Sequence, residues 1–198
     1  MQILTEREAG KFLEKKGFDV AKRIYIEKKD ELKNVSEKLG FPWVMKVSGK
    51  EIVHKTKVGG VIKNIKDYET ALKAFDKLKE IQSCEGVIIQ TQITGKEFLF
   101  GIKKTPEFGH VIAFGTGGVH VEKLKDITFR VCPFNKKEAR KMMQEVDIGK
   151  NLDKNLSDIA EKNILKLCKL AKQYPRIKEL DINPLMQGKI IDSRIVFS

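Results

Sequence analysis

Cysteine is scarce in this chain of 198 residues, and the three cysteines follow no pattern. Cys84, Cys132 and Cys168 are far apart in the sequence, and none of them belongs to a Cys-x-x-Cys pair. An odd number of unpatterned thiols argues against a disulfide framework and against a structural zinc site. The three histidines are equally scattered. We therefore expect neither a disulfide scaffold nor a fold that depends on zinc.

Long hydrophobic runs are also missing. No apolar run approaches the roughly 20 residues that a membrane-spanning helix needs, and the N-terminal MQILTEREAGKF lacks the basic and then apolar layout of a signal peptide. The composition, 41% hydrophobic and 33% charged residues, is typical of a globular domain. We therefore expect a cytoplasmic protein without a membrane segment, folded as one domain or one two-lobed unit.

Aromatic residues make up only 8% of the chain and do not alternate with basic residues, as a base-stacking surface requires. Basic residues are abundant: 39 lysines and arginines against 27 acidic residues give a net charge of +12. Such a field attracts polyanions, which include nucleic acid, nucleotides, coenzyme A and acidic partners. Because the lysines are spread over many predicted helix faces, we interpret most of the excess charge as solvated surface. We do not expect nucleic acid as the main ligand.

Hydrophobic spacing and capping residues predict helices and strands in an irregular order. Helices are expected near residues 5–16, 30–39, 67–81, 136–146 and 159–171. Strands are expected in WVMKV, near 60–65, in GVIIQTQI, EFLFGIKK and HVIAF, and in a closing pair containing ELDINPL and KIIDSRIVF. Because strands and helices do not alternate regularly, the pattern favours a mixed α+β fold with sheets in two lobes.

The closing pair of strands carries the most informative pattern. With a period of two, Asp181 and Asn183 share one strand face, while Asp192 and Arg194 share a face of the next strand. Buried carboxylates are costly unless a cation or hydrogen bonds compensate them, and Mg²⁺ prefers such oxygen ligands. The alternative is an ordinary hairpin, since Asn-Pro and Gly188 favour a turn whatever the function.

Cationic and glycine-rich segments point to a phosphate ligand. Lys46 lies in the middle of WVMKV, where it either protects a sheet edge or binds phosphate. Further on, Gly59 and Gly60 follow Lys55 in a loop whose backbone amides could lie along phosphate oxygens. A glycine pair is also common in hairpins. Next to this loop, His54 is either an idle surface histidine or a phosphoryl acceptor, because neutral imidazole is a competent nucleophile.

Two further segments have both a functional and a structural interpretation. In QTQITGKE, Gln90 and Glu97 frame a short crossing of the kind in which backbone groups read adenine and a carboxylate holds ribose; the alternative is a plain strand connection. FGTGGVHVE is a second glycine-rich loop that matches neither the dinucleotide fingerprint nor the Walker loop. After it, Arg130 is either a forked anchor for phosphate or a structural ion pair.

Taken in order, these segments resemble the ATP-grasp domain of the beta subunit of ADP-forming acetyl-CoA synthetases, which are relatives of succinyl-CoA synthetase. The resemblance covers nearly the whole chain and rests on LTEREAGKFLEKKGF, FPWVMKV, VHKTKVGG, FGHVIAFGTGGVHVEKLKDITFRV, ELDINPL and IIDSRI. One departure is Thr116, which stands where the family usually has an apolar residue. The resemblance implies a bilobed α+β fold with ATP between two small sheets. It places a small lobe at about residues 21–90, and a large lobe at about 1–20 plus 91–198.

The resemblance also implies roles for individual residues. Lys46 would bind the nucleotide phosphates under a cover formed by Gly59 and Gly60, and His54 would relay a phosphoryl group. From the residues alone, Lys55 is a further candidate for binding the phosphates, and Arg130 is a candidate catalytic anchor. Residues implied for the adenine and ribose hinge are Gln90, Thr91, Ile93 and Glu97. Those implied for Mg²⁺ are Asn183 and Asp192, with Asp181 as a weaker candidate.

The implied reaction is acyl-CoA + ADP + phosphate ⇌ free acid + ATP + CoA, through acyl phosphate and phosphohistidine. No CoA-binding domain is visible in the sequence, so the resemblance implies a separate CoA-binding alpha subunit and a hetero-oligomer. Two alternatives stay open: another ATP-grasp carboxylate ligase, and a basic nucleotide- or nucleic-acid-binding module without catalysis.

Overall fold

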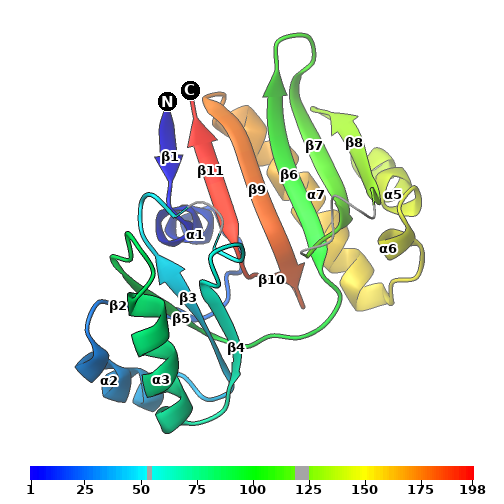
Figure 1. The fold of residues 1–198 in the computed structure, drawn as a ribbon. Coiled ribbons are helices and arrows are strands. Elements are labelled where there is room, and N and C mark those ends of the chain that lie inside the picture. Colours follow the sequence, from blue (N-terminus) through cyan, green and yellow to red (C-terminus); the bar gives the residue numbers. More distant parts are fainter. Residues whose placement is uncertain (53–54, 119–124) are drawn as a thin grey trace. The chain divides into compact units, whose positions relative to one another are not determined.

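The computed structural model describes residues 1–52, 55–118 and 125–198 (Figure 1). By its internal contacts the chain divides into two compact units. The large unit comprises Met1–Val20 and Thr94–Ser198, and the small unit comprises Ala21–Ile93. Within the described part of the chain we find no helix that combines the length and the apolar character needed to cross a bilayer.

The small unit is a four-stranded antiparallel sheet with helices on one face. In spatial order the strands are β2 (Arg23–Ile26), β5 (Gly86–Thr91), β3 (Trp43–Ser48) and β4 (Val61–Ile65). The helices are the 3₁₀ turn η1 (Lys29–Glu31), α2 (Leu32–Lys38) and α3 (Tyr68–Lys79). In Figure 1 the two α-helices lie together beside this sheet.

The alternation of β3 explains which face these helices cover. Trp43, Met45 and Val47 pack in one core with residues of α2 and α3, and strand geometry turns the residues between them to the other face. The α3 helix begins where the sequence predicts, because the Asp67 side chain accepts a hydrogen bond of 2.7 Å from the backbone N–H of Thr70. The small sheet therefore has one face in a hydrophobic core and one face without helices.

The large unit is an antiparallel sheet. Its strands in order are β1 (Gln2–Leu4), β11 (Ser193–Phe197), β9 (Ile177–Met186), β6 (Phe98–Thr105), β7 (Gly109–Thr116) and β8 (Ile127–Val131), with β10 (Lys189–Ile190) paired to β9. The predicted single closing strand KIIDSRIVF is thus interrupted, and Asp192 lies between β10 and β11. Its helices are α1 (Glu6–Lys15), α5 (Lys136–Gln144), α6 (Asp147–Lys150) and α7 (Lys154–Gln173).

One face of this sheet packs on the helices, with α7 behind β6 and β7 in Figure 1. Phe98, Phe100 and Phe114 are fully buried there and join the apolar side of α7 in one core. The predicted capping box at the start of α1 is confirmed, since Thr5 and Glu8 exchange hydrogen bonds between side chain and backbone. The opposite face of the sheet carries the acidic residues discussed below.

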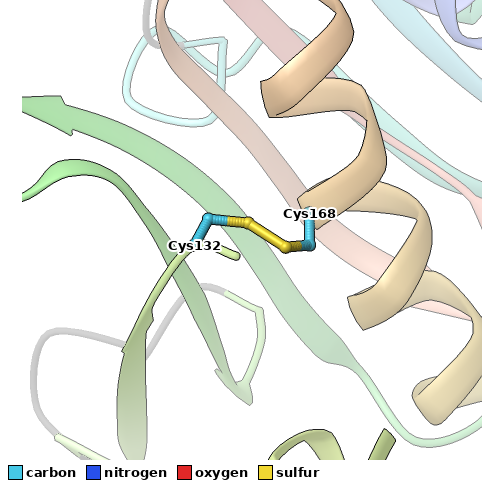
Figure 2. The surroundings of a disulfide bond; sticks show 2 residues. All are labelled: Cys132 and Cys168. Atoms are coloured by element: carbon cyan, nitrogen blue, oxygen red, sulfur yellow. A yellow bond between two sulfur atoms is a disulfide. The ribbon is translucent and has the colours of Figure 1, made fainter. Parts of the chain in front are cut away.

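A disulfide joins Cys132, just after β8, to Cys168 on α7 (Figure 2), with 5.8 Å between the two Cα atoms. A single disulfide is not the framework that the cysteine pattern argued against, but this pattern did not predict the bond either. Spacing could not reveal this bond, because the two cysteines are 36 positions apart and meet only when α7 packs against the sheet. Cys84 is a free cysteine.

Thr116, the departure noted in the second glycine loop, has a structural role. Its hydroxyl donates to the Asp126 carboxylate, which also accepts the backbone N–H groups of Asp147 and Ile148 at the start of α6. Burial alone would raise the pKa of Asp126, but these hydrogen bonds lower it overall. Thr116 therefore helps to tie β7 to α6, a contact that an apolar side chain could not make.

Candidate functional site

The helix-free face of the small sheet presents a buried lysine and a buried amide. Lys46 on β3 lies opposite Ile88 of β5, and Val44 lies opposite Gln90, so all four side chains share this face. Only 3% of Lys46 and 1% of Gln90 is exposed. A cation and an amide among apolar neighbours favour a polar, anionic ligand on this face.

Of Lys46 and Gln90, the Gln90 side chain is the stronger indication that a ligand binds on this face. Within the described residues, neither its side-chain nitrogen nor its side-chain oxygen has a hydrogen-bond partner, although both atoms are buried. Leaving such a group unsatisfied costs about 1–3 kcal/mol. A heterocyclic base has its own donors and acceptors, and it could form the hydrogen bonds that the Gln90 amide lacks.

The glycine-rich loop after the predicted phosphoryl acceptor closes against β3. The backbone N–H of Gly60 donates to Lys55 O at 2.7 Å, and Gly60 O accepts from Val47 N at 2.8 Å. A Cβ on Gly60 would come within 2.4 Å of Val47, whereas a Cβ on Gly59 would meet nothing within 4 Å. Gly60 is thus required by packing, and Gly59, with a φ of 68°, by its backbone conformation. His54 lies outside the described residues.

The predicted hinge runs across the boundary between the two units. Gln90, Thr91 and Ile93 end the small unit, and Glu97 belongs to the large unit. The backbone N–H of Thr91 donates to Lys22 O at 3.2 Å, which continues the pairing of β2 with β5 beyond the strand.

On the large sheet, the helix-free face carries the acidic residues. Asp181 of β9 lies opposite Gly101 of β6 and Arg194 of β11. Its side chain has contact with solvent, yet the surrounding protein and the like charges of Glu179 and Asp192 raise the pKa of Asp181 to about 6. Crowded carboxylates of this kind are stabilised by a cation.

Asn183 connects this face to the second glycine loop. Its Oδ1 accepts a hydrogen bond of 2.6 Å from Gly118 N, and its own backbone N–H donates to Asp192 O at 3.2 Å. The backbone N–H of Gly117 in turn donates to Glu97 O at 2.6 Å. Hydrogen bonds thus connect Glu97, the second glycine loop, Asn183 and Asp192 within the large unit.

Gly118, for which the sequence predicted no role, packs against Glu97 and hydrogen-bonds to Asn183. It has a φ of 90°, and a Cβ at this position would lie 2.0 Å from Glu97 Oε2. The Gly-Gly pair at 117–118 was the available signal, but it could not show that Glu97 and Asn183, distant in the sequence, contact this pair.

The acidic residues on this face suit Mg²⁺ better than a metal ion whose ligands all come from the protein. In the ranges that the structure describes, no set of three or more histidine, cysteine or acidic side chains is placed to hold a metal. Asp181, Asp192 and the Asn183 amide form a smaller set. Mg²⁺ is usually held by one or two carboxylates and completes its shell with waters and phosphate oxygens, so the residues present suit it.

Arg130 lies on the other face of the large sheet. Its cross-strand neighbour is Ile112 in the core, and its guanidinium donates to both carboxylate oxygens of Glu145, with Glu138 3.5 Å away. The hydrogen bond with Glu145 raises the pKa of Arg130. This is the structural ion pair that the sequence left open, and it does not bring Arg130 to the face that carries Asp181.

Comparison with known proteins defines the class. A model of the ATP-grasp domain matches residues 1–195, and the chain belongs to this family. Several similar relatives are ADP-forming acetate–CoA ligases. The chain is 39% identical to acetate–CoA ligase [ADP-forming] II of Archaeoglobus fulgidus over 98% of its own length. It spans only 30% of that relative. It is also 36% identical to acetate–CoA ligase [ADP-forming] I subunit beta of Pyrococcus furiosus, with 98% of this chain and 91% of that subunit covered.

Solved structures agree with this assignment. Acetyl-coenzyme A synthetase 1 of Ca. Korarchaeum cryptofilum, in complex with coenzyme A, Ca-AMPCP and HgCl+, superposes with a TM-score of 0.90 at 28% identity, covering 100% of this chain and 94% of that chain. In another structure of that protein, with coenzyme A and Mg-AMPPCP, a phosphohistidine segment points towards the nucleotide binding site; the TM-score is 0.83 at 29% identity, and 99% of this chain and 93% of that one are covered.

Proposed function

We propose that this chain is the nucleotide-binding beta subunit of an ADP-forming acyl-CoA synthetase. In the proposed reaction, acyl-CoA, ADP and phosphate are converted reversibly to the free acid, ATP and CoA. The observation that carries the proposal is the buried Gln90 amide, which has no hydrogen-bond partner among the residues that the structure describes and lies on the same sheet face as the buried Lys46. ATP-grasp membership and the beta-subunit relatives support it.

The small unit would bind the phosphates and the base. Lys46 would place its ammonium group beside the phosphates, and Lys55 with Gly59 and Gly60 would cover them. A compact ammonium point charge suits a polyphosphate. Among the described residues, no atom lies within 4 Å of a Cβ built on Gly59, which is consistent with an open side of the loop.

The hinge would hold the nucleoside. Gln90 would hydrogen-bond the adenine base, with the backbone groups of Thr91 and Ile93 completing the recognition. Glu97 would hold the ribose hydroxyls. The contact of Gly117 N with Glu97 O and the close approach of Gly118 support a fixed position for this carboxylate.

The large unit would hold the metal. Asp192 and Asp181 would supply carboxylate oxygens and Asn183 an amide oxygen. Mg²⁺, when bound, offsets negative charge on the nucleotide phosphates. The raised pKa of Asp181 supports this assignment, because a nearby cation would relieve the repulsion among the carboxylates.

His54 would carry the phosphoryl group between sites. In the transfer to nucleotide, the P–N bond of phosphorylated His54 breaks as a P–O bond forms to the terminal phosphate of ADP, and the imidazole takes up one proton. Lys46 and Lys55 would stabilise the charge on the transferring group. We assign Arg130 no part in this step, since Glu145 and Glu138 engage its guanidinium.

The partner would be a separate CoA-binding alpha subunit in a hetero-oligomer. The chain covers most of the length of Pyrococcus furiosus proteins named subunit beta, but less than a third of the Archaeoglobus fulgidus ligases. A separate polypeptide that supplies the remaining functions is consistent with both relationships.

A phosphorylation experiment tests the proposal. The purified chain is incubated with Mg²⁺ and ATP labelled on the γ-phosphate, and we expect label on the protein that is stable to base and labile to acid. His54→Ala should abolish the label, while the matched variant His110→Ala should keep it, because His110 Nε2 donates to the backbone carbonyl of Ile177 within the large unit. Equal labelling of His54→Ala and wild type would refute the proposed acceptor.

A further inference from the structure

A pair of amide side chains fastens the hinge of the small unit to its sheet. The backbone N–H of Asn64 donates to Gln92 Oε1 at 2.7 Å, and Gln92 Nε2 donates to Asn64 Oδ1 at 2.6 Å. Both the oxygen and the nitrogen of the Gln92 side-chain amide are therefore hydrogen-bonded to one residue of β4. Gln92 lies between Thr91 and Ile93, two of the residues in the proposed hinge.

The backbone at Asn64 is unusual in a way that serves this contact. Its φ of 59° lies in the left-handed region, which few residues other than glycine and asparagine adopt. The register between β3 and β4 shifts at the same place, between the pairs Trp43–Ile65 and Met45–Ile62. A bulge of this kind re-aims a residue out of its ladder. Here it turns both the N–H and the side chain of Asn64 toward Gln92.

The backbone of Gln92 is held as well. Its N–H donates to Pro42 O at 2.9 Å. Because proline has no N–H, residue 42 cannot return the bond that an antiparallel pair normally exchanges. Three hydrogen bonds thus fix Gln92 from one side, all of them within the small unit.

We propose that Asn64 and Gln92 form a positioning pair that sets the hinge for recognition of the nucleotide base. The pair acts through the flanking Thr91 and Ile93 and does not itself contact the base. This inference rests on the proposed function. It requires that loss of the pair weakens the binding of ligands that carry a base and leaves the binding of ligands that consist of phosphates alone unchanged.

Calorimetric titrations with MgADP and with magnesium tripolyphosphate, which lacks a base, test this requirement. Gln92→Ala should weaken MgADP binding about fivefold, as the loss of two solvent-exposed hydrogen bonds implies. Binding of tripolyphosphate should change less than about twofold. The matched control Gln82→Ala removes an exposed amide from a loop of the same unit, and it should leave both ligands unaffected.

Asn64→Gly keeps the test decisive if Gln92→Ala does not fold. Glycine tolerates the left-handed backbone and retains the N–H donor, so the variant removes only the Oδ1 acceptor. We expect about a twofold loss for MgADP, and no further loss when this change is added to Gln92→Ala. Equal losses for both ligands, or no loss for either, would overturn the inference. A wild-type chain that does not bind MgADP would instead refute the proposed function on which it stands.

Discussion

Removing the Cys132–Cys168 disulfide should destabilise the large unit by about 4 kcal/mol. The bond closes a loop over a sequence separation of 36 residues, which contains α5, α6 and most of α7. In the chain-entropy model, a loop of this length restricts the unfolded chain by about 4 kcal/mol at 25 °C. For a chain of this size that corresponds to a fall of roughly 10 °C in the midpoint of thermal unfolding.

The assay is chemical unfolding of Cys132→Ser/Cys168→Ser beside the wild type, with and without a reducing agent. The reduced wild type should match the double variant, and each single variant should lose as much as the double variant because either change breaks the same bond. Cys84→Ser is the matched control and should change nothing, since Cys84 is free.

A thiol count in the denatured, unreduced protein gives an independent check. We expect one reactive thiol before reduction and three after it, in agreement with one disulfide and one free cysteine. Three reactive thiols before reduction, or a loss of less than about 1 kcal/mol in the double variant, would refute the reasoning.

Three further predictions concern the large unit. Gly118→Ala should lower both stability and MgADP affinity, because a Cβ would lie 2.0 Å from Glu97 Oε2 at a φ of 90°; thermal unfolding and calorimetry would measure this, and wild-type values for both would contradict it. Asp181 has its pKa raised to about 6, so the folded protein binds its proton more tightly than the unfolded chain, and this residue lowers stability as the pH rises from about 4 to 6. Asp181→Asn should therefore be more stable than the wild type at pH 7, with a difference that disappears at pH 4; a constant difference would argue against the shift. Asp126 behaves in the opposite way, because its pKa is lowered from 3.8: its contribution is present above that pH and is lost as the pH falls through the folded pKa. Asp126→Asn should thus be destabilised at pH 7 and progressively less so below pH 3.8 in acid unfolding, whereas a defect that grows with acid would exclude this explanation.

Local patterns were sufficient for much of the fold. The alternation in WVMKV correctly separated Trp43, Met45 and Val47, which are in the core, from Lys46 on the other face. The capping residue Thr5 also marked the start of its helix correctly. These features depend on neighbours within a few positions, and such information is present in any single sequence.

Features that depend on distant residues were not accessible in the same way. The ion pair of Arg130 with Glu145 forms only when α5 packs against β8, so the sequence left two interpretations open. The disulfide and the contact of Gly118 with Glu97 have the same origin in tertiary packing. The bulge at Asn64 has no signature in periodicity, because it interrupts the ladder with a single residue.

The measurement that tests the account most directly is calorimetric titration of the chain with ADP, with and without Mg²⁺, for wild type and Lys46→Met. We expect Mg²⁺-dependent binding by the wild type and a loss of about tenfold or more, at least 1.4 kcal/mol, in the variant. Lys77→Met, on the exposed side of α3, is the matched control and should bind as the wild type does. Equal affinity of Lys46→Met and Lys77→Met would contradict the assignment of the small sheet's helix-free face to the nucleotide phosphates.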